Sequence, residues 1–269
     1  MEILRIFNVK LILAIALLLV ALLGGLLPHF FLKKIQKKRI AANRFVYFGN
    51  SFANGVLLTI SLVHLLPEAV ELWRQVFSPE IVLGPFLVAV FTVVSLQFIE
   101  AILAKKFSFS KNIKQFTLSG SLVLVMLSLH SIFEGIALGS SDKIGIVLMI
   151  FSAILLHKTT AAFALGVNLE CRGIKKGTFI LQKIILFSLM TPLGIFLGSS
   201  LIMISQGKNA ILIQALMNSI AAGTFIYIVA ILNENKVCSH DPITFSEEFF
   251  GWVLFTIATT ITALAAFVV

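Results

Sequence analysis

Three ionisable side chains in two neighbouring apolar segments have the types and the spacing of a metal site. His130 and Glu134 are four residues apart in the segment HSIFEG, so on a helix they lie on one face about a turn apart. His157 opens the segment HKTTAAF further along the chain. Two imidazoles and one carboxylate suit a borderline divalent ion such as Zn²⁺, and Fe²⁺ and Mn²⁺ are also compatible. A His–Glu hydrogen bond inside a helical bundle is the alternative, but the third donor favours a metal site.

The segments that carry these residues are predicted to cross a membrane. Of the 269 residues, 59% are hydrophobic and 12% are charged, against about 45–50% apolar and about 25% charged residues in soluble domains. This composition excludes a soluble enzyme. We expect an all-α polytopic membrane protein with a single transmembrane domain over residues 1–269, because apolar stretches long enough to cross a bilayer recur along the chain. Eight transmembrane helices are predicted, at residues 11–31, 45–66, 81–103, 116–139, 144–169, 179–204, 210–232 and 249–269.

Lys and Arg residues indicate how these helices are oriented. The formal net charge is +9, but the cations lie in short runs between apolar segments, which predicts the lipid bilayer as a partner and no nucleic acid. Most of them fall in the connections after the first, third, fifth and seventh predicted helices. Because Lys and Arg are enriched in cytoplasmic loops, we expect a multi-pass protein of the cell membrane with both termini outside. Cys171 and Cys238 then face the cytosol, and they do not form a readable disulfide framework.

The fourth and fifth predicted helices must form an antiparallel hairpin, because only a short turn joins them. His130 and His157 then differ in depth by about 6 Å at 1.5 Å per residue, which a modest tilt removes. An ammonium at Lys158 opposes a nearby cation unless Glu134 neutralises it, since an intramembrane charge needs a partner. Lys158 therefore either locks the hairpin through Glu134 or takes an active part at the metal site.

A second polar group lies at the end of the second predicted helix. His64 comes just before Pro67 and Glu68, so an arriving cation would find an imidazole and a carboxylate there. An ordinary interfacial histidine explains the position of His64 equally well. We interpret the remaining candidates as ordinary loop or interface residues: His29, Cys238, His240 and Asp241.

Two pairs of glycines have the spacing that allows close helix contact. They are Gly135 with Gly139 and Gly194 with Gly198. Small residues four apart let helix backbones approach one another in a membrane. We expect these pairs to pack helices within the chain, and dimerisation through them is the second interpretation.

The motifs around these residues resemble those of the ZIP (Zrt- and Irt-like) family of divalent metal transporters. HSIFEGIALG at 130–139 and HKTTAAFALG at 157–166 are similar to the metal-helix motifs HSxxEGxALG and HKxxxAFxLG. Similarity continues in GLLP at 25–28, FANGVLLTISLVHLLPE at 52–68, MTPLGIFLG at 190–198 and AAGTFIYI at 221–228. The resemblance implies eight helices in a 3+2+3 arrangement whose outer sets of three are related as inverted repeats. It also implies a homodimer that imports Zn²⁺ or a similar ion toward the cytosol by an elevator-like or rocking motion.

The resemblance places His130, Glu134 and His157 in the primary metal site. In two-metal family members a carboxylate follows the first ligand of the fifth helix, whereas Lys158 stands there in this chain. Ser131 replaces a common Asn. We therefore expect no second ion and expect the ammonium of Lys158 to take its electrostatic place.

Two further departures from the family pattern concern the exit route and the ion affinity. Ala161 stands where other members supply an additional ligand. Asn218 lies in the seventh helix, where acidic residues are usual. These positions leave the fold expectation unchanged.

Three functions are compatible with such a site. A carrier binds the ion and releases it inward, and the absence of a phosphate-binding loop or ATPase motif in the sequence favours an ion gradient as its driving force. An intramembrane zinc hydrolase would retain its ion to activate water, but the sequence has no HExxH motif. A transport-inactive metal sensor is the third function. We expect the carrier, which is not an enzyme and has no permanently bound cofactor, with Zn²⁺ as its substrate and Fe²⁺, Mn²⁺ or Cd²⁺ as alternatives.

Overall fold

Helices make up all of the regular structure in the described part of the chain. The computed structural model describes residues 2–35, 39–77, 82–108, 115–141, 143–171, 177–201, 208–234 and 244–268. Eight helical stretches in these residues are long and apolar enough to cross a membrane, which confirms the expected all-α polytopic membrane fold. In chain order the elements are α1 (Glu2–Ile35), α2 (Arg39–Thr59), η1 (Ile60–Leu65), α3 (Leu66–Arg74), α4 (Leu83–Ser108), α5 (Gln115–Ser140), α6 (Ile144–Cys171), α7 (Gly177–Leu201), α8 (Lys208–Glu234) and α9 (Phe245–Val268).

Several helices begin before or end after the predicted spans. α1 begins at Glu2 rather than near residue 11, and α9 begins at Phe245 rather than near residue 249. Hydropathy marks the segment that fits into hydrocarbon, whereas a helix continues into the interface as long as its backbone hydrogen bonds are made. Residues 81, 202–204 and 269 of the predicted spans lie outside the described residues.

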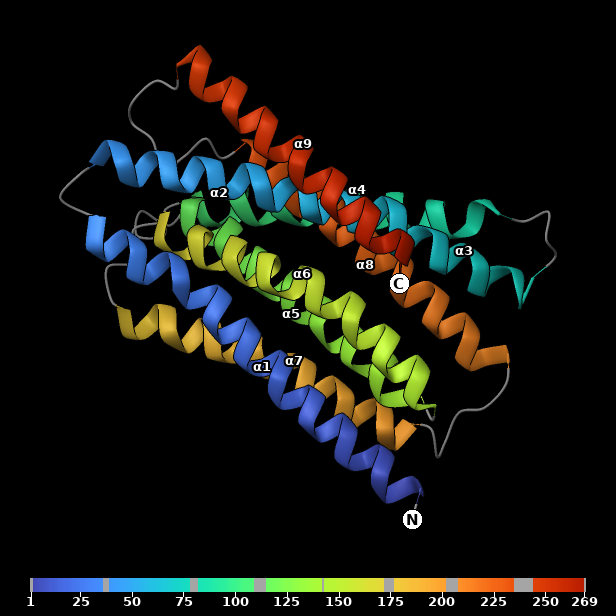
Figure 1. Ribbon diagram of the computed structural model, residues 1–269. Coiled ribbons are helices and arrows are strands. Elements are labelled where there is room, and N and C mark those ends of the chain that lie inside the picture. Colours follow the sequence, from blue (N-terminus) through green and yellow to red (C-terminus); the bar gives the residue numbers. More distant parts are fainter. Residues whose placement is uncertain are drawn as a thin grey trace.

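The segments α2, η1 and α3 follow one another as a single helical rod that passes the expected end at residue 66 (Figure 1). Pro67 lies in the first turn of α3. Proline has no N–H to donate, and its ring crowds the carbonyl four residues earlier, so it normally interrupts a helix. Here the π-helix η1 ends at Leu65, two residues before the proline, and its wider turns make room for the proline ring. The rod therefore carries His64 and Glu68 on one continuous element.

The helices pack as two groups (Figure 1). In the first group α5 packs mainly against α7, and α1 packs against α6 and α7. In the second group α2 packs against α9, and α4 and α3 pack against α8. The groups meet mainly where α6 contacts α2 and where α5 contacts α8 and α4. The 3+2+3 arrangement and its inverted repeats stay predictions.

Glycines bring the helix backbones of the first group into direct contact. A methyl group on Gly135 of α5 would lie 2.8 Å from Cα of Gly194 of α7, which is inside van der Waals contact. Gly139 and Gly198 make similar contacts with Ile195 and Ile136, respectively, one turn along. The predicted packing role of the two glycine pairs is confirmed. Because α5 carries His130 and Glu134, this crossing also fixes the helix that holds two of the three proposed ligands.

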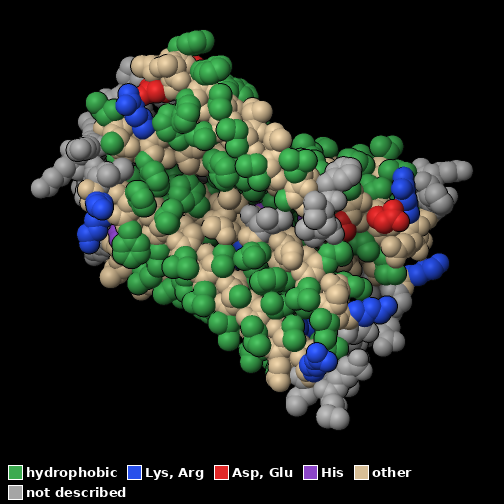
Figure 2. Space-filling view, in the orientation of Figure 1, with side chains coloured by type: hydrophobic (Ala, Val, Ile, Leu, Met, Phe, Trp, Pro, Cys, Tyr) green, Lys and Arg blue, Asp and Glu red, His purple; other side chains and the backbone are tan. Residues whose placement is uncertain are grey.

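Apolar side chains cover the middle of the bundle surface, and Lys and Arg gather toward its ends (Figure 2). Large side chains such as Phe91 and Leu23 are 73% and 70% exposed, which lipid tails accommodate. We name the end of the bundle where α1 and α4 end and α2 begins the basic end, because the sequence has most of its Lys and Arg next to these helix termini and those of α6 and α7. The described cations near the termini of α1, α2 and α4 there are Lys33, Lys34, Arg44 and Lys105.

Candidate metal site

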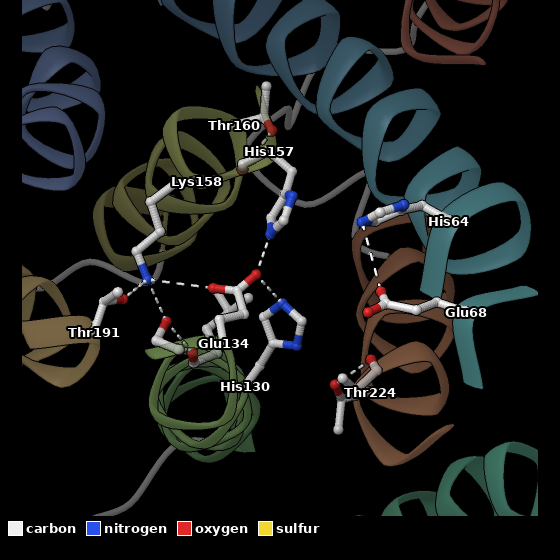
Figure 3. A network of polar contacts seen from close by, with 12 residues as sticks. His64, Glu68, His130, Glu134, His157, Lys158, Thr160, Thr191 and Thr224 are labelled. Atoms are coloured by element: carbon white, nitrogen blue, oxygen red, sulfur yellow. Dashed lines mark hydrogen bonds and ion pairs between the residues drawn. The ribbon is translucent and has the colours of Figure 1, made fainter. Parts of the chain in front are cut away.

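The hairpin of α5 and α6 brings three donors together inside the bundle (Figure 3). His130 and Glu134 of α5 and His157 of α6 each offer a ligand atom, and these atoms all lie within 4.8 Å of one another. All three side chains are buried, and His130 and His157 are each only 2% exposed. Among the described residues, this is the one group of three His, Cys or carboxylate donors close enough to share an ion. The three donors are therefore largely closed to solvent in this conformation.

The two carboxylate oxygens of Glu134 face different partners. Oε1 lies 2.7 Å from Nε2 of His130 and is in direct contact with Nε2 of His157. Oε2 lies 3.8 Å from Nζ of Lys158. Glu134 therefore links both imidazoles to the ammonium.

Lys158 is enclosed by polar and aromatic groups. Its ammonium donates a hydrogen bond of 2.6 Å to Oγ of Ser131 and another of 2.6 Å to Oγ1 of Thr191. Nζ also lies 4.5 Å from the centre of the Phe187 ring. A buried ammonium is costly unless its three protons and its charge find partners. The two hydroxyls, the ring face and Glu134 provide them, so Lys158 is held in one place beside the donors.

An aromatic ring from the second group covers the two histidines. The ring centre of Phe225 in α8 lies 4.0 Å from that of His130 and 5.7 Å from that of His157. Phe225 and Thr191 lie within the sequence motifs, but the sequence alone predicts no role for either. Both come from helices distant in sequence, and a motif match does not show which side chain faces the donors.

His64 and Glu68 lie together but belong to the α2–η1–α3 rod rather than to the hairpin (Figure 3). Nε2 of His64 is 3.8 Å from Oε2 of Glu68, and their side chains are 28% and 37% exposed. Asn218 of α8 lies beside Glu68. The pair is far more accessible than the buried donors, and it lies toward the end of the bundle opposite the basic end.

The other predicted positions contribute in different ways. Ser131 binds Lys158 and donates its hydroxyl to its own helix at the carbonyl of Leu127. Ala161 is buried and has no donor atom in its side chain. The cluster of Cys238, His240 and Asp241 lies outside the described residues.

The donor set fits a borderline divalent ion. Two imidazole nitrogens and a carboxylate oxygen are ligands that Zn²⁺ commonly takes. Nδ1 of His130 and Nδ1 of His157 have no hydrogen-bond partner among the described residues, which is unusual for buried polar atoms. The geometry thus offers the metal ligands together with one resident cation, Lys158.

The sequence profile of the ZIP zinc transporters matches the chain over residues 7–111 and 106–232. The chain belongs to the ZIP zinc transporter family. Zinc transporter ZIP1 of Danio rerio is 40% identical over 107 residues, which cover 40% of this ZIP chain and 35% of that protein. Zinc transporter ZIP2 of Mus musculus is 33% identical over 125 residues, which cover 45% of this chain and 40% of that protein. Protein zntD of Dictyostelium discoideum is 33% identical over 122 residues, which cover 45% of this chain and 18% of that protein. The match therefore spans less than half the length of each of these relatives.

The family match includes every residue of the candidate site. His130, Glu134, His157 and Lys158 all lie within the second matched range, 106–232. Thr191 and Phe225, which the structure adds to the site, lie within the same range. The site described here is therefore part of the ZIP domain itself.

Proposed function

We propose that this ZIP chain is a carrier that moves Zn²⁺ or a similar divalent transition-metal ion through His130, Glu134 and His157. The observation that carries the proposal is the meeting of these three buried donors within 4.8 Å. Ionisable groups inside a membrane are costly, and they typically mark an ion path. The relatives ZIP1 and ZIP2 bear the name zinc transporter, which supports zinc as the ion.

The proposed direction is toward the basic end, which the positive-inside rule assigns to the cytosol. Both termini are then outside, and the protein is a multi-pass protein of the cell membrane. The His64–Glu68 pair lies toward the opposite end and is partly exposed. Its imidazole and carboxylate meet an arriving ion before the ion reaches the buried donors.

Lys158 favours release of the ion over permanent retention. Glu134 is the one carboxylate of the donor group, and its Oε2 already faces the ammonium. A divalent ion on the other oxygen is therefore bound by a partly neutralised carboxylate and is repelled by Lys158. No second ion is needed beside Glu134, because the ammonium provides a positive charge there. Weak retention of this kind suits a transported substrate better than the resident ion of a hydrolase.

The two packing groups are the proposed moving parts. The first group carries the three donors and Lys158, and its glycine contacts hold it together as a unit. The second group carries Phe225 and the His64–Glu68 pair. A shift of the first group along the second moves the donors away from the Phe225 ring and changes the end to which they open, as in elevator-like or rocking transport. A homodimer remains part of this proposal.

One experiment separates the carrier from the hydrolase and the sensor. Purified protein is reconstituted in proteoliposomes, and uptake of radiolabelled Zn²⁺ is measured together with the metal content of the purified protein. A carrier accumulates Zn²⁺ in the vesicles and loses it readily on purification. A hydrolase retains a stoichiometric ion without uptake, and a sensor binds added ion without moving it.

A further inference from the structure

Besides the central site, a His–carboxylate pair lies at the basic end. Nδ1 of His29, near the end of α1, contacts Oε1 of Glu170, near the end of α6. From the sequence, His29 is interpreted as an ordinary loop or interface residue, because proximity in sequence does not show which side chains lie near it in space. The structure places Glu170 beside His29, and Glu170 lies on α6, the helix that also carries His157.

Close packing of α1 on α6 creates the pair. Gly24 faces Thr159 and Ala162, and Gly25 faces Gly166. A methyl group on Gly166 would collide with the backbone carbonyl oxygen of Gly25, so the two backbones can approach this closely only because residue 166 is glycine. The two helices run in the same direction, and one turn beyond this crossing they bring His29 and Glu170 together. The position of the pair is therefore fixed by the helix crossing.

The ring of His29 is oriented as in many metal-binding histidines. A carboxylate that holds one ring nitrogen fixes the tautomer and leaves the other nitrogen free to ligate. Here Glu170 takes Nδ1, and Nε2 lies toward Gly177 at the start of α7, where an added methyl group would be 3.3 Å from Nε2. The side chains of His29 and Glu170 are 24% and 20% exposed. They are thus open to an ion, unlike His130 and His157.

We propose that His29, oriented by Glu170, is a second metal-binding position that takes Zn²⁺ or a similar divalent ion at the basic end. Its place in the ion path, as the first acceptor after the central donors, rests on the proposed function. The binding of a metal ion at His29 does not depend on the proposed function. Glu170 lies about 20 Å beyond His157 along α6, at 1.5 Å per residue, so the two sites are separate. Since His29 offers one protein ligand and Glu170 only orients it, we expect weaker binding than at the central site, and this would allow the ion to pass on.

The test uses the full chain in lipid nanodiscs with the central site disabled. The background is His130→Leu with His157→Leu, which leaves Glu134 as the counter-ion of Lys158. Equilibrium binding of radiolabelled Zn²⁺ gives the number of ions bound with and without His29→Gln. Visible absorption of added Co²⁺ reports separately whether an imidazole ligates. Glu247→Gln is the matched control, because this carboxylate pairs with Arg44 at the same end and has no histidine partner among the described residues.

The proposal predicts that His29→Gln removes one bound ion and the corresponding Co²⁺ absorption, whereas Glu247→Gln changes neither. Glu170→Gln, which keeps a hydrogen-bonding side chain, should weaken binding by about 10-fold, as removal of an orienting carboxylate commonly does. Size-exclusion profiles and metal-free melting temperatures verify that each variant is folded. Equal stoichiometry with and without His29→Gln would overturn the site. Zn²⁺ flux through the wild-type chain tests the proposed function separately. If the wild type transports Zn²⁺ but Zn²⁺ binding does not depend on His29, this second site is refuted and the proposed function stands.

Discussion

Nζ of Lys158 lies 3.8 Å from Oε2 of Glu134, while Oε1 of the same carboxylate faces His130 and His157. One buried carboxylate thus serves both the resident ammonium and the proposed metal ligands. Ser131 holds the ammonium from the same helix as Glu134. Binding of a metal ion therefore changes the electrostatic balance of Lys158 as well as that of the donors.

The first prediction concerns Lys158→Met, which removes the charge and keeps a similar chain length. In metal-free protein the variant leaves the buried carboxylate of Glu134 without its ammonium partner and with only the two imidazoles beside it, which should lower the free energy of unfolding by about 3 kcal/mol. Added Zn²⁺ supplies the missing positive charge, so it should raise the melting temperature more in the variant than in the wild type. Thermal unfolding in detergent with and without Zn²⁺ measures both effects.

Lys183→Met is the control for this experiment. Lys183 lies in α7 with Nζ 5.0 Å from the centre of the Phe179 ring, and it is not part of the donor group. Its substitution should leave the Zn²⁺-induced shift at the wild-type value. An equal shift for Lys158→Met and wild type would contradict the shared role of Glu134.

The second prediction concerns Phe225→Ala. The ring covers both imidazoles, so its loss should loosen their orientation and admit water to the donors. We expect Zn²⁺ to bind about 10-fold more weakly, a typical cost when groups that orient metal ligands are removed. Phe225→Leu, which keeps an apolar side chain there, should retain more affinity. Zn²⁺ titration of the purified variants tests this, and unchanged affinity in Phe225→Ala would show that the ring has no role in binding.

The hairpin and its donors could be predicted because their geometry is local. The spacing of His130 and Glu134 is set within one helix, and the short turn before α6 fixes the depth of His157. The contacts of Thr191 and Phe225 could not be predicted in this way. In a bilayer the outer faces of the helices are apolar as well, so hydrophobic periodicity does not identify the face that points inward.

Two other structural features could not be predicted from the sequence, for related reasons. The helical rod continues past Pro67 because η1 widens the turn before it, and no composition signal marks a π-helix. The partner of His29 depends on the crossing of α1 and α6 at Gly25 and Gly166. That crossing joins segments far apart in sequence, so the glycines alone do not reveal which helix meets which.

The third prediction uses two glycines of the same hairpin. Gly135→Ala places a methyl group 2.8 Å from Cα of Gly194 and must push α5 and α7 apart, which should cost about 1–3 kcal/mol. Gly145→Ala meets nothing within 4 Å, and alanine favours a helix by about 0.5–1 kcal/mol over glycine. Melting temperatures should therefore fall for Gly135→Ala and hold or rise for Gly145→Ala. Equal stability of the two variants would contradict the close α5–α7 contact.

The fourth prediction is that acid on the side of His64 inhibits uptake. Imidazole binds a metal only when neutral, and carboxylate only when ionised. Free imidazole titrates near about pH 6.5 and a free glutamic acid near about pH 4.3, so competition by protons should become strong below roughly pH 6. Initial Zn²⁺ uptake at constant free Zn²⁺ between about pH 7.5 and 5 measures this effect. Uptake that rises steadily toward pH 5 would instead indicate proton-coupled symport.

The most direct test of the central claim is the initial rate of radiolabelled Zn²⁺ uptake into proteoliposomes for wild type, His157→Ala and Thr160→Ala. Thr160 lies on the same helix and its hydroxyl donates to the backbone carbonyl of His157, so it controls for a change in α6 that removes no ligand. At subsaturating Zn²⁺ and equal reconstituted amounts, His157→Ala should lose at least about 10-fold in rate, because even groups that only orient a ligand contribute that much. Thr160→Ala should stay close to the wild-type rate. Wild-type uptake by His157→Ala would show that the ion does not pass through the His130–Glu134–His157 site.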